Sequence, residues 1–134
     1  MNTFLVKLEG AAKQYRNGRE MNEVVAPCHI AIPPGVLWVL EGPSGSGKTT
    51  LLGLLGGLIA PTSGFVTFGN ENITELREHH RCDLRRRSVG FVFQELALIA
   101  GMSVIENVLL PLIPSGGAKP DDIKHANTLL TQMG

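Results

Sequence analysis

Residues 42–49 have the sequence Gly42-Pro43-Ser44-Gly45-Ser46-Gly47-Lys48-Thr49, which matches the pattern G-x-x-x-x-G-K-[ST] at every fixed position. The glycines allow the backbone to curl so that successive N–H groups point inward and form a concave site for an anion. A helix that begins after the loop adds the positive end of its dipole to the same site. The stretch therefore predicts a phosphate-binding loop of a nucleotide-binding protein.

The residues on both sides of the loop have the pattern that such a loop requires. The run Val36-Leu37-Trp38-Val39-Leu40 is continuously apolar, which is typical of a strand covered on both faces in a parallel sheet. Leucines recur after Lys48 until Pro61 and Gly64 prevent a helix from continuing. The order strand, glycine loop and helix predicts an α/β fold.

The rest of the chain predicts further short elements. We expect strands over residues 4–8 and 24–32, separated by a turn at 16–18, so the first forty residues are rich in β structure. A strand at 65–68 and a second buried strand at 89–93 follow. Helices are expected over 73–87, over 102–110 and from Pro120 onward. We see no internal repeat or low-complexity linker, so residues 1–134 are expected to belong to one domain.

Composition excludes several classes of protein. Hydrophobic residues make up 43% and charged residues 18% of the chain, which is typical of a folded domain rather than a disordered segment. The formal net charge is zero, so nucleic acid is not an expected partner. The apolar stretch 51–60 contains three glycines and is too short to cross a bilayer. Any connection to a membrane is therefore expected through a partner.

The loop motif predicts a role for each polar side chain at its C-terminal end. Lys48 is expected to reach the β- and γ-phosphate oxygens, where negative charge is densest. The Thr49 hydroxyl is expected to ligate Mg²⁺ beside water and phosphate oxygens. Thr50, one step into the helix, is able to donate a further hydrogen bond.

Two blocks of sequence resemble one family. Residues 42–52 (GPSGSGKTTLL), together with Gly56-Gly57-Leu58 and Pro61-Thr62-Ser63-Gly64, resemble the ATP-binding-cassette (ABC) transporter ATPases. The block LRRRSVGFVFQ at 84–94, followed by MSVIENV at 102–108, resembles the Q-loop region of that family. The likeness is strongest to its lipoprotein-release and macrolide-export subgroup.

The resemblance implies a fold, ligands and partners. It implies a P-loop NTPase of ABC type with an N-terminal β-rich subdomain, binding ATP and Mg²⁺. It implies that Gln94 is the Q-loop glutamine, which approaches Mg²⁺ and the attacking water, and that the Tyr15 ring stacks on adenine. It also implies an integral-membrane partner subunit, a second ATPase subunit in a head-to-tail dimer, and a cytoplasmic location at the inner face of the cell membrane.

Other motifs of the family do not occur in these 134 residues. There is no apolar strand ending in Asp-Glu, no Leu-Ser-Gly-Gly-Gln signature, no D-loop and no histidine switch. We therefore expect the N-terminal part of an ABC domain with an incomplete core sheet, which binds nucleotide but does not hydrolyse it alone. Exposed apolar strand edges are expected to cause low stability or self-association.

Two other functions remain open from the residues alone. One is a non-hydrolytic nucleotide-binding or docking module, and the other is a small-molecule kinase, which shares only the loop. The Gln94 block argues against the kinase. We interpret His79-His80 as part of a solvated helical face and Arg85-Arg86-Arg87 as a surface turn before a strand, and we assign no role to Glu41 or Glu95.

Overall fold

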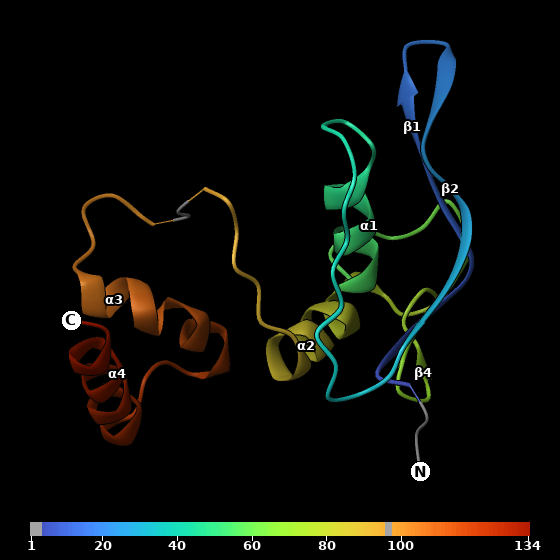
Figure 1. Cartoon of the computed structure of the whole chain (residues 1–134). Helices are drawn as coiled ribbons and strands as arrows, with labels where there is room; N and C mark the ends of the chain where they lie inside the picture. The colour runs from blue at the N-terminus through green and yellow to red at the C-terminus, as the bar shows by residue number, and fades with distance from the viewer. Residues whose placement is uncertain (1–3, 96–97) are drawn as a thin grey trace. The chain divides into compact units, whose positions relative to one another are not determined.

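The computed structural model describes residues 4–95 and 98–134. The chain divides into two compact units, residues 1–90 and 91–134 (Figure 1). The first unit contains the phosphate-binding loop and the second contains Gln94. The assignment of residues 1–134 to one domain stays a prediction.

A four-stranded antiparallel sheet forms one layer of the first unit. Its strands lie in the order β2-β1-β3-β4. Their bounds are β1 Val6–Asn17, β2 Glu20–Ile32, β3 Ser63–Phe68 and β4 Glu71–Asn72. β1 and β2 form a long hairpin around Gly18, which has a φ of +61° as a tight turn requires. The β-rich opening and its turn are thus confirmed.

Two helices accompany this sheet. They are α1, Lys48–Leu55, and α2, Glu78–Ser88. α1 begins at the end of the glycine loop as predicted, but it ends at Leu55, before Pro61, where the sequence predicted the helix to stop. Gly56 caps it, and Gly57 then turns the chain with a φ of +69°.

The core of the first unit lies where the sheet meets the helices. Leu8, Leu54 and Val66 are its largest fully buried side chains. The connected core cluster consists of Val6, Leu8, Ala11, Leu55, Val66, Ile73 and Leu84. Residues of β1, β3, α1 and α2 all contribute, so burial of this cluster sets the position of the helix that follows the loop.

The two predicted buried strands do not form. Residues 36–40 and 89–93 have no strand assignment, and Leu37 is 92% exposed. A strand requires hydrogen bonds to a neighbour, and no strand in the described ranges pairs with either run. The apolar pattern predicts the strand correctly only where such a neighbour is present. The prediction was therefore wrong for the described residues, and their one sheet is antiparallel.

The second unit is helical. It contains α3, Val104–Leu109, the 3₁₀ helix η1, Leu110–Ser115, and α4, Pro120–Met133. Ser103 and Glu106 form a capping box at the start of α3. Asn107 binds both the N–H and the C=O of Ile99, which holds the preceding loop against the helix. α3 ends near Pro111 as predicted, although 3₁₀ turns continue the chain.

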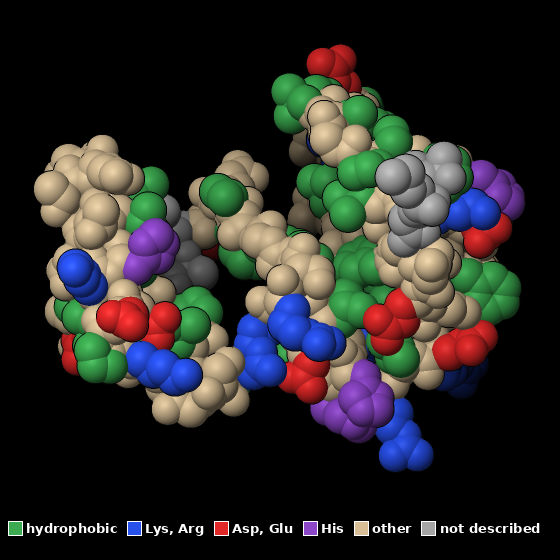
Figure 2. Space-filling model, turned by 90° about the horizontal axis from the view of Figure 1, so that it is seen from below, with side chains coloured by type: hydrophobic (Ala, Val, Ile, Leu, Met, Phe, Trp, Pro, Cys, Tyr) green, Lys and Arg blue, Asp and Glu red, His purple; other side chains and the backbone are tan. Residues whose placement is uncertain are grey.

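Hydrophobic side chains reach the surface in both units, as the green areas of Figure 2 show. They include Leu37, Val39 and Val92 in the unassigned runs and Met133 at the end of α4. Within the described ranges, every helix is too short or too polar to cross a bilayer.

Candidate nucleotide-binding site

The phosphate-binding loop leads directly into α1. The N–H of Ser46 donates to the carbonyl of Pro43 at 3.3 Å, and the N–H of Leu51 donates to the carbonyl of Gly47 at 2.8 Å. The first bond closes a turn inside the loop, and the second starts the helix. The N-terminal end of α1, with its unpaired N–H groups, therefore faces the loop.

Lys48 folds back over the loop. Its Nζ donates to the carbonyls of Gly42 at 2.8 Å and Pro43 at 2.6 Å, and it lies 3.5 Å from the Ser46 Oγ. The ammonium group is thereby fixed at the mouth of the loop. A phosphate oxygen at this point would meet a positive charge and the helix N-terminus together.

A cavity of about 330 Å³ lies at the loop, and Lys48 is one of the residues that line it. Five of the predicted phosphate-binding residues line it: Gly42, Pro43, Ser46, Gly47 and Lys48. Residues 24–26 of β2, Leu40, Glu41 and Leu51 complete the wall. The loop and one stretch of β2 therefore line a single cavity. Glu41, to which the sequence assigned no role, borders it.

The contact between β2 and the loop depends on an irregularity in the hairpin. Lys13 pairs with Val25, but Gln14 pairs with Glu23, so Val24 is an extra residue in β2. A Cβ at Gly47 would collide with the Val24 carbonyl oxygen. The bulge thus brings the β2 backbone against the loop. β-Bulges are common beside functional sites. No sequence signal marks Val24.

Thr49 and Thr50 lie in the first turn of α1. Thr49 is exposed and Thr50 is half-buried. Ser44 and Gly45 are exposed. The role of Thr49 toward Mg²⁺ stays a prediction, as does the hydrogen bond expected from Thr50.

Tyr15 lies near the end of β1 and pairs with Asn22 of β2. Tyr15 is 43% exposed, and the Lys13 Nζ lies 5.1 Å from the centroid of its ring. Gln94 is exposed in the second unit. The adenine role of Tyr15 and the Q-loop role of Gln94 remain predictions.

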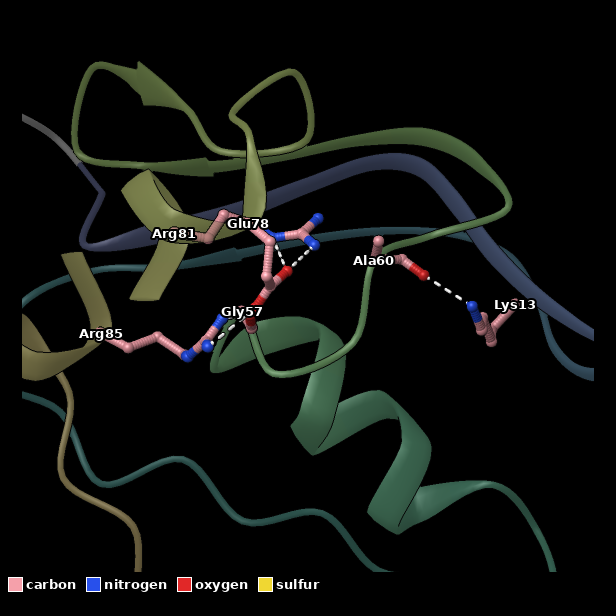
Figure 3. Close-up of polar contacts among 6 residues, drawn as sticks. All are labelled: Lys13, Gly57, Ala60, Glu78, Arg81 and Arg85. Atoms are coloured by element: carbon pink, nitrogen blue, oxygen red, sulfur yellow. Dashed lines mark hydrogen bonds and ion pairs between the residues drawn. The ribbon is translucent and has the colours of Figure 1, made fainter. Parts of the chain in front are cut away.

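Basic side chains fix the segment that follows α1 (Figure 3). Arg85 Nη1 donates to the carbonyl of Gly57 at 2.8 Å, and Lys13 Nζ donates to the carbonyl of Ala60 at 2.8 Å. Arg85 is only 16% exposed and pairs with Glu78. The interpretation of Arg85 as part of a surface turn before a strand was wrong, because Arg85 lies within α2 and its side chain binds the Gly57 carbonyl, 28 positions away in the sequence.

The charge of Glu78 is stabilised in the same cluster. Hydrogen bonds from Arg81 and then Arg85 hold the pKa of the Glu78 carboxyl below its ordinary value. This carboxylate orients both arginines, so the guanidinium of Arg85 is held at the C-terminal end of α1. A positive charge there complements the helix dipole.

A family model described as "ABC transporter" matches residues 25–134, which include the loop, α1 and the Gln94 block. The chain belongs to the ABC transporter family.

Relatives within this ABC family confirm the expected subgroup. The lipoprotein-releasing system ATP-binding protein LolD of Legionella pneumophila (strain Lens) is 40% identical over all 134 residues, which cover 59% of that protein. The macrolide export ATP-binding/permease protein MacB of Syntrophobacter fumaroxidans is 41% identical over 132 residues, which are 97% of this chain and 18% of that protein. The chain thus spans little more than half the length of LolD.

A solved ABC structure shares the fold. The ATP-binding cassette MJ0796, in a dimeric post-hydrolysis state bound to ADP and Pi, superposes with a TM-score of 0.86 at 36% identity. The match covers 94% of this chain and 56% of that one. The ABC-type α/β fold predicted from the loop and its flanks is thus confirmed.

Proposed function

We propose that this chain binds MgATP through residues 42–49 as the ATP-binding part of an ABC transporter of the LolD and MacB type. The observation that carries the proposal is that two loop carbonyls hold the Lys48 ammonium, and that Lys48 and both carbonyl residues line the cavity. There the charge of Lys48 and the N-terminus of α1 act on the same volume.

This arrangement suits the terminal phosphates of a nucleotide. Lys48 is long enough to exchange a carbonyl contact for a phosphate oxygen while the loop N–H groups bind the remaining oxygens. Thr49, next along the helix, would hold Mg²⁺ through its hydroxyl. The ADP and Pi named for the MJ0796 cassette support a nucleotide ligand at a shared fold.

The family resemblance assigns two further roles, to Tyr15 and to Gln94. The exposed Tyr15 ring offers a flat apolar surface for adenine at low entropic cost. Gln94 would approach Mg²⁺ and the attacking water, and it would link the ATP site to the membrane subunit. Both roles rest on the family resemblance alone.

The proposed partners follow from the relatives. LolD is named as part of a lipoprotein-releasing system, MacB as an export protein that includes a permease, and MJ0796 as a dimer. We assign to this chain an integral-membrane partner, a second ATPase subunit packed head to tail, and a location at the cytoplasmic face of the membrane. Closure of the two ATPase subunits on ATP would drive the membrane partner to export or release its substrate. We assign residues 1–134 to one ATPase domain.

The proposal for these 134 residues alone is binding without turnover, since they contain neither an Asp-Glu strand end nor the signature motif. Steady-state ATP hydrolysis by the wild-type chain and by Lys48→Ala measures this directly. A rate above background that disappears in Lys48→Ala would overturn the non-hydrolytic part and leave nucleotide binding in place.

Binding itself is tested by stabilisation. A ligand that binds only the folded state raises the unfolding midpoint. We expect MgADP to raise the midpoint of the wild-type chain and of Lys7→Ala, a surface lysine on β1, but not that of Lys48→Ala. Equal shifts in wild type and Lys48→Ala would contradict binding through the loop.

A further inference from the structure

Lys13 joins two parts of the first unit that are far apart in sequence. Its Nζ donates to the carbonyl of Ala60 at 2.8 Å, a contact visible in Figure 3. The same ammonium lies 5.1 Å from the centroid of the Tyr15 ring. The lysine is therefore anchored at the segment after α1 while its charge rests near an aromatic side chain.

This double contact restricts the Tyr15 ring. A cation within about 6 Å of a ring centroid is attracted by the negative face of the ring. The bond to Ala60 fixes the cation, and the cation in turn limits the rotation of the ring. Because Tyr15 is still 43% exposed, part of the ring remains accessible to a ligand. A ring held in one orientation loses less entropy when a planar group stacks on it.

Lys13 and Tyr15 also lie on the hairpin whose second strand lines the loop cavity. Lys13 pairs across the hairpin with Val25, which lines the cavity. Tyr15 pairs with Asn22, two positions before the bulged Val24 that packs on Gly47. The ring is thus carried by the same stretch of hairpin that contacts the phosphate-binding loop.

We infer that Lys13 is a positioning residue for the nucleotide base: it holds the Tyr15 ring so that the base of a nucleotide bound at residues 42–49 stacks on its accessible face. The inference rests on the proposed nucleotide-binding function. It assigns to Lys13 an effect on the base-dependent part of affinity and no effect on the phosphate-dependent part.

The test compares two ligands that share phosphates but not a base, MgADP and magnesium tripolyphosphate, by calorimetric titration. Lys13→Met keeps the apolar stem and removes the charge. We expect it to weaken MgADP binding by about 2- to 5-fold, the effect of an exposed cation–π contact, and to leave tripolyphosphate binding unchanged. Lys7→Met, the same substitution on the same strand, should change neither.

Two further variants connect Lys13 to Tyr15. We expect Tyr15→Leu to weaken MgADP by about 5- to 100-fold, as loss of base–aromatic stacking does, and Lys13→Met to add nothing in the Tyr15→Leu background. Lys13→Arg should restore wild-type affinity, because a guanidinium also packs over aromatic rings.

Several outcomes would overturn the inference. Equal losses for both ligands in Lys13→Met would mean that Lys13 supports only the fold. Additive losses in the double variant would mean that it acts independently of Tyr15. An unchanged MgADP affinity in Tyr15→Leu would show that the ring does not contact the base. If tripolyphosphate binding were at the same time lost only in Lys48→Ala, the inference about Lys13 would fail and the proposed phosphate binding by the loop would stand.

A measurement on the wild-type chain needs no variant to fold. Tyr15 is the only tyrosine of the sequence, so ring-labelled tyrosine gives one set of NMR signals. We expect MgADP to shift these signals strongly and tripolyphosphate to shift them little. Equal shifts, or none with MgADP at saturation, would contradict base stacking, and no binding of either ligand would overturn the proposed function as well.

Discussion

Gly47 occupies the most crowded position in the phosphate-binding loop. Its φ is +85°, and a Cβ there would collide with the Val24 carbonyl. Gly45 has a similar φ of +77°, but a Cβ there would meet nothing within 4 Å. An alanine at Gly45 would therefore meet backbone strain alone, whereas an alanine at Gly47 would meet both backbone strain and a steric collision.

Alanine at these two positions should destabilise the chain unequally. We expect Gly45→Ala to lower the free energy of unfolding by about 1–2 kcal/mol, the cost of a left-handed conformation for an L-residue. Gly47→Ala should lower it further, because β2 must also move away from the loop. Urea unfolding without ligand measures both values, and equal losses would contradict the close approach of Val24.

The loop is the part of the site that the sequence predicts most fully. Its glycine spacing has a local physical cause, and five of its predicted residues line the cavity. Val24 and Lys13 could not be predicted, since a bulge in the hairpin and a contact with Ala60 arise only when distant segments fold together.

At the scale of elements, α1 is held at both ends. Its N-terminus continues from the phosphate-binding loop, and its C-terminal end is bound by Arg85 of α2 through the Gly57 carbonyl. Since α1 is only eight residues long, a shift at its C-terminal end would reach the loop. The cluster of Arg85 and Glu78 thus stabilises the position of the loop from the far end of the helix.

Removing the Arg85 side chain should destabilise the first unit. We expect Arg85→Met to lower the free energy of unfolding by about 1–2 kcal/mol, because the partly buried Gly57 carbonyl loses its donor. Arg86→Met removes only a surface pair with Asp83 and should change it by less than about 0.5 kcal/mol. Chemical denaturation of both variants measures the difference, and similar values would refute the anchoring role.

The same cluster predicts a pH dependence. The pKa of Glu78 is lowered in the folded state, so its ionised form stabilises the fold above its unfolded pKa, and this contribution is lost as the pH falls through the folded value. Between about pH 5 and pH 3, stability should fall less in Arg85→Met than in wild type. An identical pH profile for the two proteins would show that the pair contributes nothing.

Element predictions succeeded where the signal was local. The hairpin turn at Gly18, the start of α1 and the strand at Phe65–Phe68 each follow from residues next to them. Residues 36–40 and 89–93 differ, because an apolar run becomes a buried strand only beside hydrogen-bonded neighbours. The family was predicted from two blocks that resemble ABC ATPases. One block includes the phosphate-binding loop and the start of α1, and the other includes residues 89–93, which do not form the predicted strand.

At the scale of the whole molecule, the unassigned apolar runs leave large side chains in water. Leu37, Val39 and Val92 are all exposed although their neighbours in sequence are apolar too. Apolar side chains exposed in this way promote association between chains. The chain covers 59% of the length of its LolD relative, and the expectation of self-association applies to the 134 residues as they stand.

Charge at Leu37 should reduce this association. Leu37→Lys places a charge on a side chain that is already in water, so we expect unchanged stability and a lower sedimentation-average mass at high concentration. Met133→Lys, on a similarly exposed residue of the second unit, is the matched control. A mass that rises with concentration equally in all three proteins would contradict association through the 36–40 run.

The central claim is that residues 42–49 bind the phosphates of a nucleotide through Lys48. Isothermal titration of the wild-type chain and of Lys48→Ala with MgADP tests it most directly, with circular dichroism to verify that both are folded. We predict saturable one-to-one binding by the wild type and at least a tenfold weaker affinity, about 1.4 kcal/mol, in Lys48→Ala. Equal affinity in the two folded proteins, or no binding by the wild type, would contradict the claim.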